Sequence, residues 1–96
     1  MTSTKYQAED LENWLKKHTN WQCVENKLYR RLVFEDFVHA FSFITQIALL
    51  AEKMNHHPEW ANVYRTVDVY LTSHDIEGIS ERDLALAVEI DRIVGE

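Results

Sequence analysis

The residues best suited to chemistry in this sequence are His56 and His57, which stand side by side in the segment KMNHHPEW (53–60). Pro58 follows them, so the apolar helical run before them must end here. Adjacent side chains on an irregular segment point in different directions, so one imidazole could hold a ligand while the other meets a reacting atom. His74 closes the last predicted strand, a second element end that could converge on the first. Imidazole gives and takes protons near neutral pH, so the three histidines predict general acid–base chemistry.

These histidines also allow two other interpretations. A helix C-terminus could use the HHP segment structurally, with the imidazoles contacting the last carbonyls. A zinc site is the other alternative, but no Cys or His falls at a usual ligand spacing, so we expect no metal. His18 and His39 lie in ordinary helical surroundings that favour a surface role. Cys23, alone in an apolar strand, is typical of a small core residue rather than a nucleophile.

Length and charge limit the classes of function. The chain has 96 residues, which predicts a single domain over residues 1–96. Its formal net charge of −6 disfavours direct binding to nucleic acid and to anionic membranes. The sequence has one cysteine, no leader pattern and no apolar span of membrane length. We therefore expect a cytoplasmic protein that is not inserted in a membrane.

The first half of the chain predicts a helix, two strands and a second helix. Residues 8–18 have apolar side chains on one helical stripe, with acidic residues at the start and lysines at the end. The segments 21–24 and 27–34 are β-branched and aromatic, and Glu25-Asn26 separates them as a short hairpin connection. A long helix over 36–54 follows, with Asp36 as a plausible N-cap.

The 36–54 helix is apolar over an unusually wide surface. Its two apolar stripes are Phe37, Phe41, Ile44, Ala48, Ala51 and Ala40, Phe43, Ile47, Leu50, Met54. The stripes lie about 100° apart, so together they are wider than one sheet-facing stripe requires. Either the helix is sunk deeply in its own core, or it meets a second subunit. We predict a homodimer or homotetramer in which Phe43, Ile47 or Leu50 touches the equivalent helix of the partner.

The second half of the chain predicts two more strands and a last helix. Residues 60–74 alternate, with Val63, Val67 and Val69 on one parity, and a tight turn near Arg65-Thr66 could divide them into a hairpin. The chain should then turn at Gly78, and Ser80 with an acidic residue three positions on matches a helix cap before a helix to about residue 94. The sequence thus predicts an α+β fold of order α-β-β-α-β-β-α, a four-stranded antiparallel sheet with three helices on one face.

One long segment resembles a known family. Residues 51–87, AEKMNHHPEWANVYRTVDVYLTSHDIEGISERDLALA, resemble the pterin-4a-carbinolamine dehydratases without a gap. The family pattern is E-K-x-[DN]-H-H-P-x-W-x-N-V-Y, followed by a T-H-[DE] segment and then G-[LI]-[ST]-x-[KR]-D. The upstream segment FEDFVHAFSFITQIALLAE (34–52) also fits, so the resemblance covers most of the chain after Lys27.

The resemblance implies a reaction and a set of site residues. The reaction is dehydration of 4a-hydroxytetrahydropterin to quinonoid dihydropterin, which recycles the pterin cofactor after aromatic amino-acid hydroxylation. The family histidines fall on His56, His57 and His74. The implied substrate-binding residues are Glu52, Asn55, His56, His57, Thr72, Ser73 and His74. His56 and His74 suit the acid and base roles, and His57 suits orientation of the substrate. No metal or cofactor is implied.

The resemblance also implies an alternative of another class. Family members in animals serve as dimerisation partners of a homeodomain transcription factor, and some bacterial and plastid relatives resemble assembly chaperones with weakened histidine sites. A protein partner is therefore possible for this chain. The complete set of His56, His57 and His74 favours an active enzyme, because a pure scaffold has no need of three imidazoles.

Overall fold

The computed structural model describes residues 6–95 and contains the predicted elements in the predicted order. The elements are α1 (Ala8–Lys17), β1 (Gln22–Val24), β2 (Lys27–Val33), α2 (Phe37–Met54), β3 (Glu59–Val63), β4 (Thr66–Leu71), a 3-10 turn η1 (His74–Ile76) and α3 (Glu81–Ile93). The strands form one antiparallel sheet of order β1-β2-β4-β3. The α+β prediction, with order α-β-β-α-β-β-α, is confirmed.

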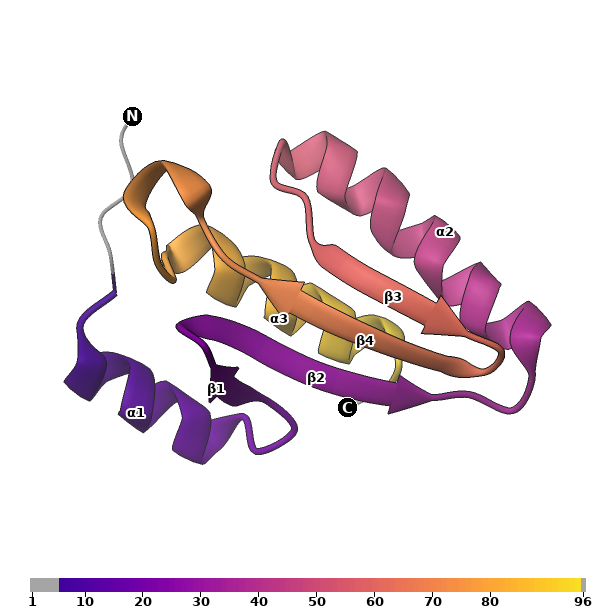
Figure 1. The fold of residues 1–96 in the computed structure, drawn as a ribbon, viewed down its shortest axis with the longest axis horizontal. Helices are drawn as coiled ribbons and strands as arrows, with labels where there is room; N and C mark the ends of the chain where they lie inside the picture. Colours follow the sequence, from indigo (N-terminus) through magenta and orange to yellow (C-terminus); the bar gives the residue numbers. More distant parts are fainter. Residues whose placement is uncertain (1–5, 96) are drawn as a thin grey trace.

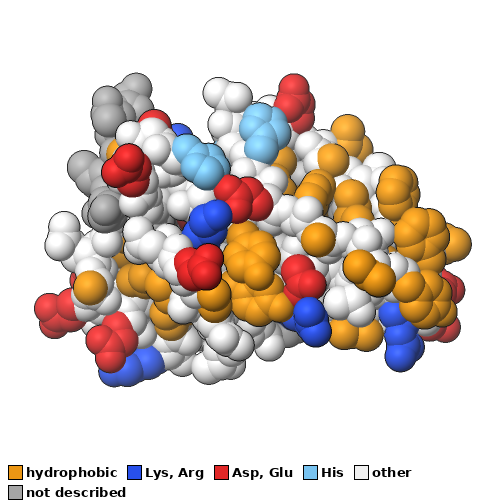
Figure 2. All heavy atoms as spheres, in the orientation of Figure 1, with side chains coloured by type: hydrophobic (Ala, Val, Ile, Leu, Met, Phe, Trp, Pro, Cys, Tyr) orange, Lys and Arg blue, Asp and Glu red, His pale blue; other side chains and the backbone are white. Residues whose placement is uncertain are grey.

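The three helices cover one face of the sheet. Figure 1 shows α3 behind the strands, α2 alongside β3 and α1 beside β1. The strands alternate accordingly, because successive side chains point to opposite faces. The buried members of the alternation in β2 and β4 are Leu28, Arg30, Leu32, Val67, Val69 and Leu71. Within residues 6–95, no helix lies on the other face of the sheet, where Figure 2 shows hydrophobic and charged side chains.

Local signals in the sequence account for the ends of the elements. Glu25 and Asn26 both have positive φ, 51° and 64°, as the two central residues of a tight hairpin turn of the primed type require. Asp36 caps α2, since its side chain accepts a hydrogen bond from the backbone N–H of His39 at 2.8 Å. Ser80 and Asp83 form the capping box of α3.

A buried polar cluster joins α3 to the sheet and to the α1–β1 connection. Arg30 forms an ion pair with Asp91, and both residues are over nine-tenths buried. The indole N–H of Trp21 donates to both carboxylate oxygens of Asp91, at 2.9 and 3.1 Å. Breaking such a pair from one side would leave a buried charge without its counter-ion, so these residues fix how α3 docks.

The structure corrects the predicted use of the two stripes of α2. Ala40, Phe43, Ile47 and Ala51 are buried in the chain's own core. Phe43 and Ile47 therefore cannot make the predicted contact with a partner helix, because both are buried in the chain's own core. Leu50 is half-buried, and its contact with a partner helix stays a prediction. The large apolar side chains of α2 that are exposed are Phe37, Val38, Phe41 and Leu49.

Two further details of the 60–74 segment differ from expectation. Val63 is 76% exposed although Val67 and Val69 are fully buried. The turn at Tyr64-Arg65 resets the alternation, so that Val63 pairs with Thr66 on the uncovered face of the sheet. His74 begins the η1 turn three residues after β4 ends, instead of closing the strand. Within residues 6–95, no helix is both long and apolar enough to cross a lipid bilayer.

Candidate active site

The predicted histidines meet at one cavity of about 320 Å³ at an edge of the molecule. The lining residues come from the connection after α2, the end of β4, the η1 turn and the start of α3: Asn55, His56, His57, Thr72, Ser73, His74, Asp75 and Arg82. Figure 2 shows pale-blue histidine side chains in the upper part of this face, close to acidic ones. Six of the seven predicted substrate-binding residues line the cavity, and Glu52 lies beside it, in contact with His57.

The end of α2 explains how two neighbouring histidines reach different environments. Asn55 takes the left-handed conformation (φ 52°, ψ 41°), which asparagine tolerates better than most residues and which ends the helix. The backbone N–H of His56 then bonds back to the carbonyl of Ala51 at 3.0 Å. This sharp end turns the His56 ring inward, where the residue is only 7% exposed, and leaves the His57 side chain 58% exposed.

His56 is held by a fully buried carboxylate. Its Nε2 lies 2.5 Å from Oδ1 of Asp83, which has no exposed surface. The other oxygen of Asp83 accepts from the Ser73 hydroxyl and from the backbone N–H of Ser80, both at 2.8 Å. These hydrogen bonds hold the Asp83 carboxylate in place, and the carboxylate in turn orients the His56 imidazole.

His57 and His74 each pair with a carboxylate nearer the surface. Nε2 of His57 lies 2.8 Å from Oε1 of Glu52, and Nε2 of His74 lies 2.9 Å from Oε2 of Glu59. All three imidazoles therefore use Nε2 for a carboxylate. When Nε2–H donates in this way, Nδ1 of the neutral ring is the nitrogen left to exchange a proton with a bound molecule.

An arginine supplies positive charge at the same cavity. Arg82 donates from Nη2 to Oδ1 of Asp75 at 2.6 Å. The hydrogen bond from Arg82 and its charge hold the pKa of Asp75 below the usual 3.8. The cavity thus combines imidazoles, a guanidinium and the Thr72 hydroxyl, a set that suits a small polar heterocycle with several donors and acceptors.

Three of the carboxylates at this site were missed by the sequence analysis: Glu59, Asp75 and Asp83. Asp83 was interpreted only as part of a helix cap. A signal was available, because Asp83 falls on the same helical face as Ala87 and Ile90, and a carboxylate on an apolar face needs a buried partner. Glu59 is a half-exposed strand residue with no such signal.

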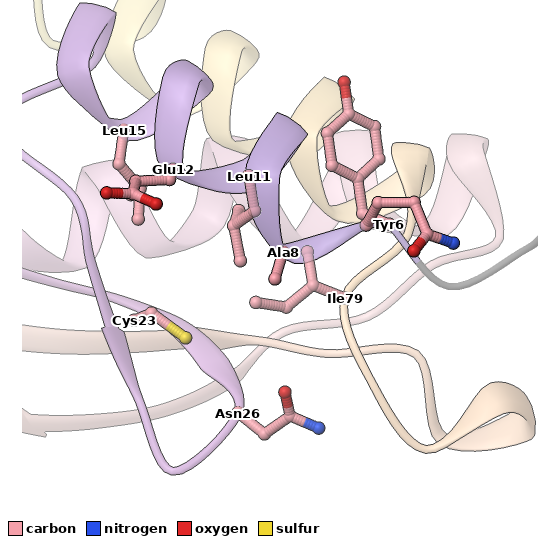
Figure 3. A pocket seen from close by; sticks show the side chains of 9 residues that line it. Tyr6, Ala8, Leu11, Glu12, Leu15, Cys23, Asn26 and Ile79 are labelled. Carbon is pink, nitrogen blue, oxygen red and sulfur yellow. The ribbon is translucent and has the colours of Figure 1, made fainter.

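A larger cavity of about 470 Å³ lies between α1 and the β1–β2 hairpin (Figure 3). Leu11, Leu15 and Ile79 form much of its wall, with Asn26 and Cys23 facing it. Cys23 is exposed, so its predicted place in the core is wrong. None of the lining residues of this cavity is a histidine. The smaller cavity is the candidate active site because it gathers the proton-transfer groups. Residues 6–95 contain no cluster of three or more His, Cys, Asp or Glu side chains placed to hold a metal ion.

Comparisons with known proteins identify close relatives. The family model described as pterin 4 alpha carbinolamine dehydratase matches residues 4–93. A protein of Prochlorococcus marinus (strain MIT 9313), named "Putative pterin-4-alpha-carbinolamine dehydratase", is 50% identical over 91 residues, 95% of each chain. A protein of Solibacter usitatus with the same name is 44% identical over 91 residues, 95% of this chain and 96% of the other.

Two solved structures share the fold. A transcriptional coactivator/pterin dehydratase from Brucella melitensis superposes with a TM-score of 0.91 and 38% identity, over 95% of this chain and 99% of the other. A pterin dehydratase-like protein that is a RuBisCO assembly factor in the alpha-carboxysome superposes with a TM-score of 0.67 and 22% identity, over 79% of this chain and 88% of the other. The second likeness shows a shared fold.

Proposed function

The chain belongs to the pterin 4 alpha carbinolamine dehydratase family, and we propose that it is an active enzyme that dehydrates 4a-hydroxytetrahydropterin by histidine general acid–base catalysis. The products are quinonoid dihydropterin and water, so the enzyme would serve to recycle a pterin cofactor. The observation that carries this proposal is the set of three imidazoles around one cavity, each paired through Nε2 with a carboxylate.

The reaction needs one proton donor and one proton acceptor. The hydroxyl at C4a leaves as water once an acid protonates its oxygen, and the ring C=N bond forms as a base takes the proton from the adjacent ring nitrogen. Each step is fastest with a group that titrates near the working pH. His56 and His74 fit these roles because they reach the cavity from two different elements, the end of α2 and the η1 turn.

The surrounding residues would orient the groups and the substrate. Asp83 holds the ring of His56 and lies beside the positive charge whenever that ring is protonated. We assign His57, with Glu52, to substrate orientation, together with Asn55, Thr72 and Ser73 at the cavity wall. Positioning of this kind lowers the entropic cost of reaching the transition state.

We also propose that the protein assembles into a homodimer or homotetramer through the exposed stripe of α2, the part of the helix surface that carries Phe37 and Phe41. Phe37 and Phe41 are 47% and 54% exposed, and their rings contact each other at 5.8 Å between centroids. From Phe37 to Ala51 the helix contains no Asp, Glu, Lys or Arg. A second copy can therefore lie against this face without repulsion between like charges.

A stopped-flow assay of the purified chain on freshly made 4a-hydroxytetrahydropterin tests the enzymatic proposal. We expect a rate well above that of buffer alone and no change on addition of a chelator. Activity that disappears with the chelator and returns with zinc would contradict the proposed mechanism. A rate equal to that of buffer would reject the dehydratase activity and favour a role as a protein-binding scaffold.

A further inference from the structure

A chain of charged side chains runs from the uncovered face of the sheet to His74. Nζ of Lys27, on β2, lies 2.7 Å from Oε1 of Glu59, on β3. The two strands are not neighbours, because β4 lies between them, so the Lys27–Glu59 pair crosses the central strand. The second oxygen of Glu59 contacts Nε2 of His74 at 2.9 Å. One carboxylate thus binds a lysine of the sheet and an imidazole of the candidate active site.

We propose that Glu59, anchored by Lys27, is a positioning residue that sets the orientation of the His74 ring. The inference rests on the proposed dehydratase function, since it assigns a task to groups around one of the proton-transfer histidines. Lys27 and Glu59 play no part in the resemblance that identifies the site histidines, and neither residue lines the cavity.

His74 needs such a partner because little else holds it. Its side chain is 77% exposed and stands on a turn of three residues. Within residues 6–95, Glu59 provides the side-chain contact of the His74 ring. An exposed imidazole without a partner samples several rotamers, and a group that must meet a substrate atom within hydrogen-bond distance then acts less often.

Lys27 keeps the Glu59 carboxylate charged and in place. The hydrogen bond from Lys27, its charge and the contact with His74 hold the pKa of Glu59 below the usual 4.5. Glu59 is therefore an anion near neutral pH, and an anion makes the stronger hydrogen bond to the His74 ring. The other charged or titratable groups at the cavity are Asp75, Arg82, His56 and His57.

Four variants separate charge from position. Glu59→Gln removes the anion and Lys27→Met removes the cation, while Glu59→Asp keeps the charge on a shorter side chain. Arg31→Met is the matched control, because it breaks a second ion pair, with Asp68, on the same face of the sheet. Each variant is assayed for dehydratase kcat and KM, and the rotamer populations of the His74 side chain are measured by NMR.

The His74 ring should lose its single orientation when its partner is changed. In Glu59→Gln and Lys27→Met the ring should populate several rotamers, and kcat should fall with little change in KM. Glu59→Asp should also lower kcat with little change in KM, because its shorter side chain withdraws the carboxylate from the ring. Arg31→Met should change neither the rotamers of His74 nor kcat.

The two readouts distinguish the failure of this inference from the failure of the proposed function. If the His74 rotamer populations are the same in wild type, Glu59→Gln and Lys27→Met, the inference is overturned, whatever the activity. If the populations spread as described while the wild-type rate equals that of buffer, the positioning of His74 by Glu59 and Lys27 stands and the dehydratase function is rejected. A spread of rotamers together with a lower kcat supports both proposals.

Discussion

Oδ1 of Asp83 lies 2.5 Å from Nε2 of His56, and the two residues are 27 positions apart in the chain. Asp83 also belongs to the capping box of α3. The same carboxylate therefore starts a helix and orients an imidazole of the candidate active site. The two tasks can be tested separately. Ser80 also caps α3, but the carboxylate beside His56 belongs to Asp83.

Asp83→Asn should lower kcat by about 100-fold or more, since an amide cannot replace the anion beside the His56 ring. Ser80→Ala is the control. It removes a cap hydroxyl, at a cost of about 1 kcal/mol in unfolding free energy, but leaves the contact between Asp83 and His56. Stopped-flow rates and urea unfolding measure the two effects. Equal losses of activity in both variants would mean that Asp83 acts only through the helix.

His56→Ala and His74→Ala should each retain part of the activity, with opposite preferences for the two configurations of the C4a hydroxyl. The reason is that the two rings reach the cavity from different elements. The double variant should lose about 10²–10⁴-fold and approach the uncatalysed rate. His57→Ala should mainly raise KM, as expected for a group that binds substrate and transition state alike. Stopped-flow assays on separated stereoisomers test this; equal kcat losses without stereochemical preference would contradict the division of roles.

His39 should make the stability of α2 dependent on pH. Its hydrogen bond to Asp36, with the charges of Asp36 and Glu35, raises the pKa of His39 above the usual 6.5. A raised pKa in the folded state means that this contribution is complete below pH 6.5 and is lost as the pH rises through the folded value. His39→Gln should therefore be less stable than wild type just below pH 6.5 and equal to it at about pH 9. Urea unfolding just below pH 6.5 and at about pH 9 measures the difference in unfolding free energy.

A milder variant serves as the control for His39. Glu35→Gln removes the more distant anion, 3.6 Å from Nε2 of His39, and should reduce the pH dependence only in part. If His39→Gln differed from wild type by the same amount at both pH values, the ion pair would not be the cause.

Assembly should depend on Phe41 and folding on Ile47. Phe41→Asp places a charge on the exposed stripe of α2 and should shift the mass measured by light scattering toward the 11.4 kDa monomer, with an unchanged circular dichroism spectrum. Ile47→Asp buries a charge in the core and should unfold the chain. A monomeric wild type at micromolar concentration would disprove the proposed assembly.

The sequence contained enough local information to predict the three α-helices and four strands, but not the 3-10 turn η1. Asp36 and Ser80 are caps whose signals lie within three residues of the helix start, and Glu25-Asn26 is a turn of minimal length between two apolar runs. Such signals need no knowledge of the rest of the chain, which is why the order and approximate bounds of the elements were predictable.

Local sequence could not predict which apolar residues of α2 face the core. Both stripes have helical spacing and similar apolar content, so neither periodicity nor composition ranks them. Ala40 and Ile47 face the core because β4 and α3 lie on that side, and those elements begin more than ten residues beyond the end of α2. The position of Val63 was misjudged for a related reason, since a two-residue turn reverses the strand and restarts its alternation.

The histidine cluster was predictable from residue type and spacing, but its carboxylate partners were not. Asp83 and Glu59 reach their imidazoles through the docking of α3 and the register of β3. A pattern in one stretch of sequence indicates which side chains can move protons. Which groups orient those side chains depends on elements brought together by the whole fold.

The backbone N–H of Ser80 donates to Asp83, the carboxylate that holds His56. If the first turn of α3 opens locally, that amide becomes free to exchange with solvent deuterium and His56 loses its partner in the same event. The protection factor of one amide therefore measures how often a folded molecule stands without a working active site. Substrate that requires the closed turn would slow this exchange, and the slowing would report occupancy of the site without any turnover being observed.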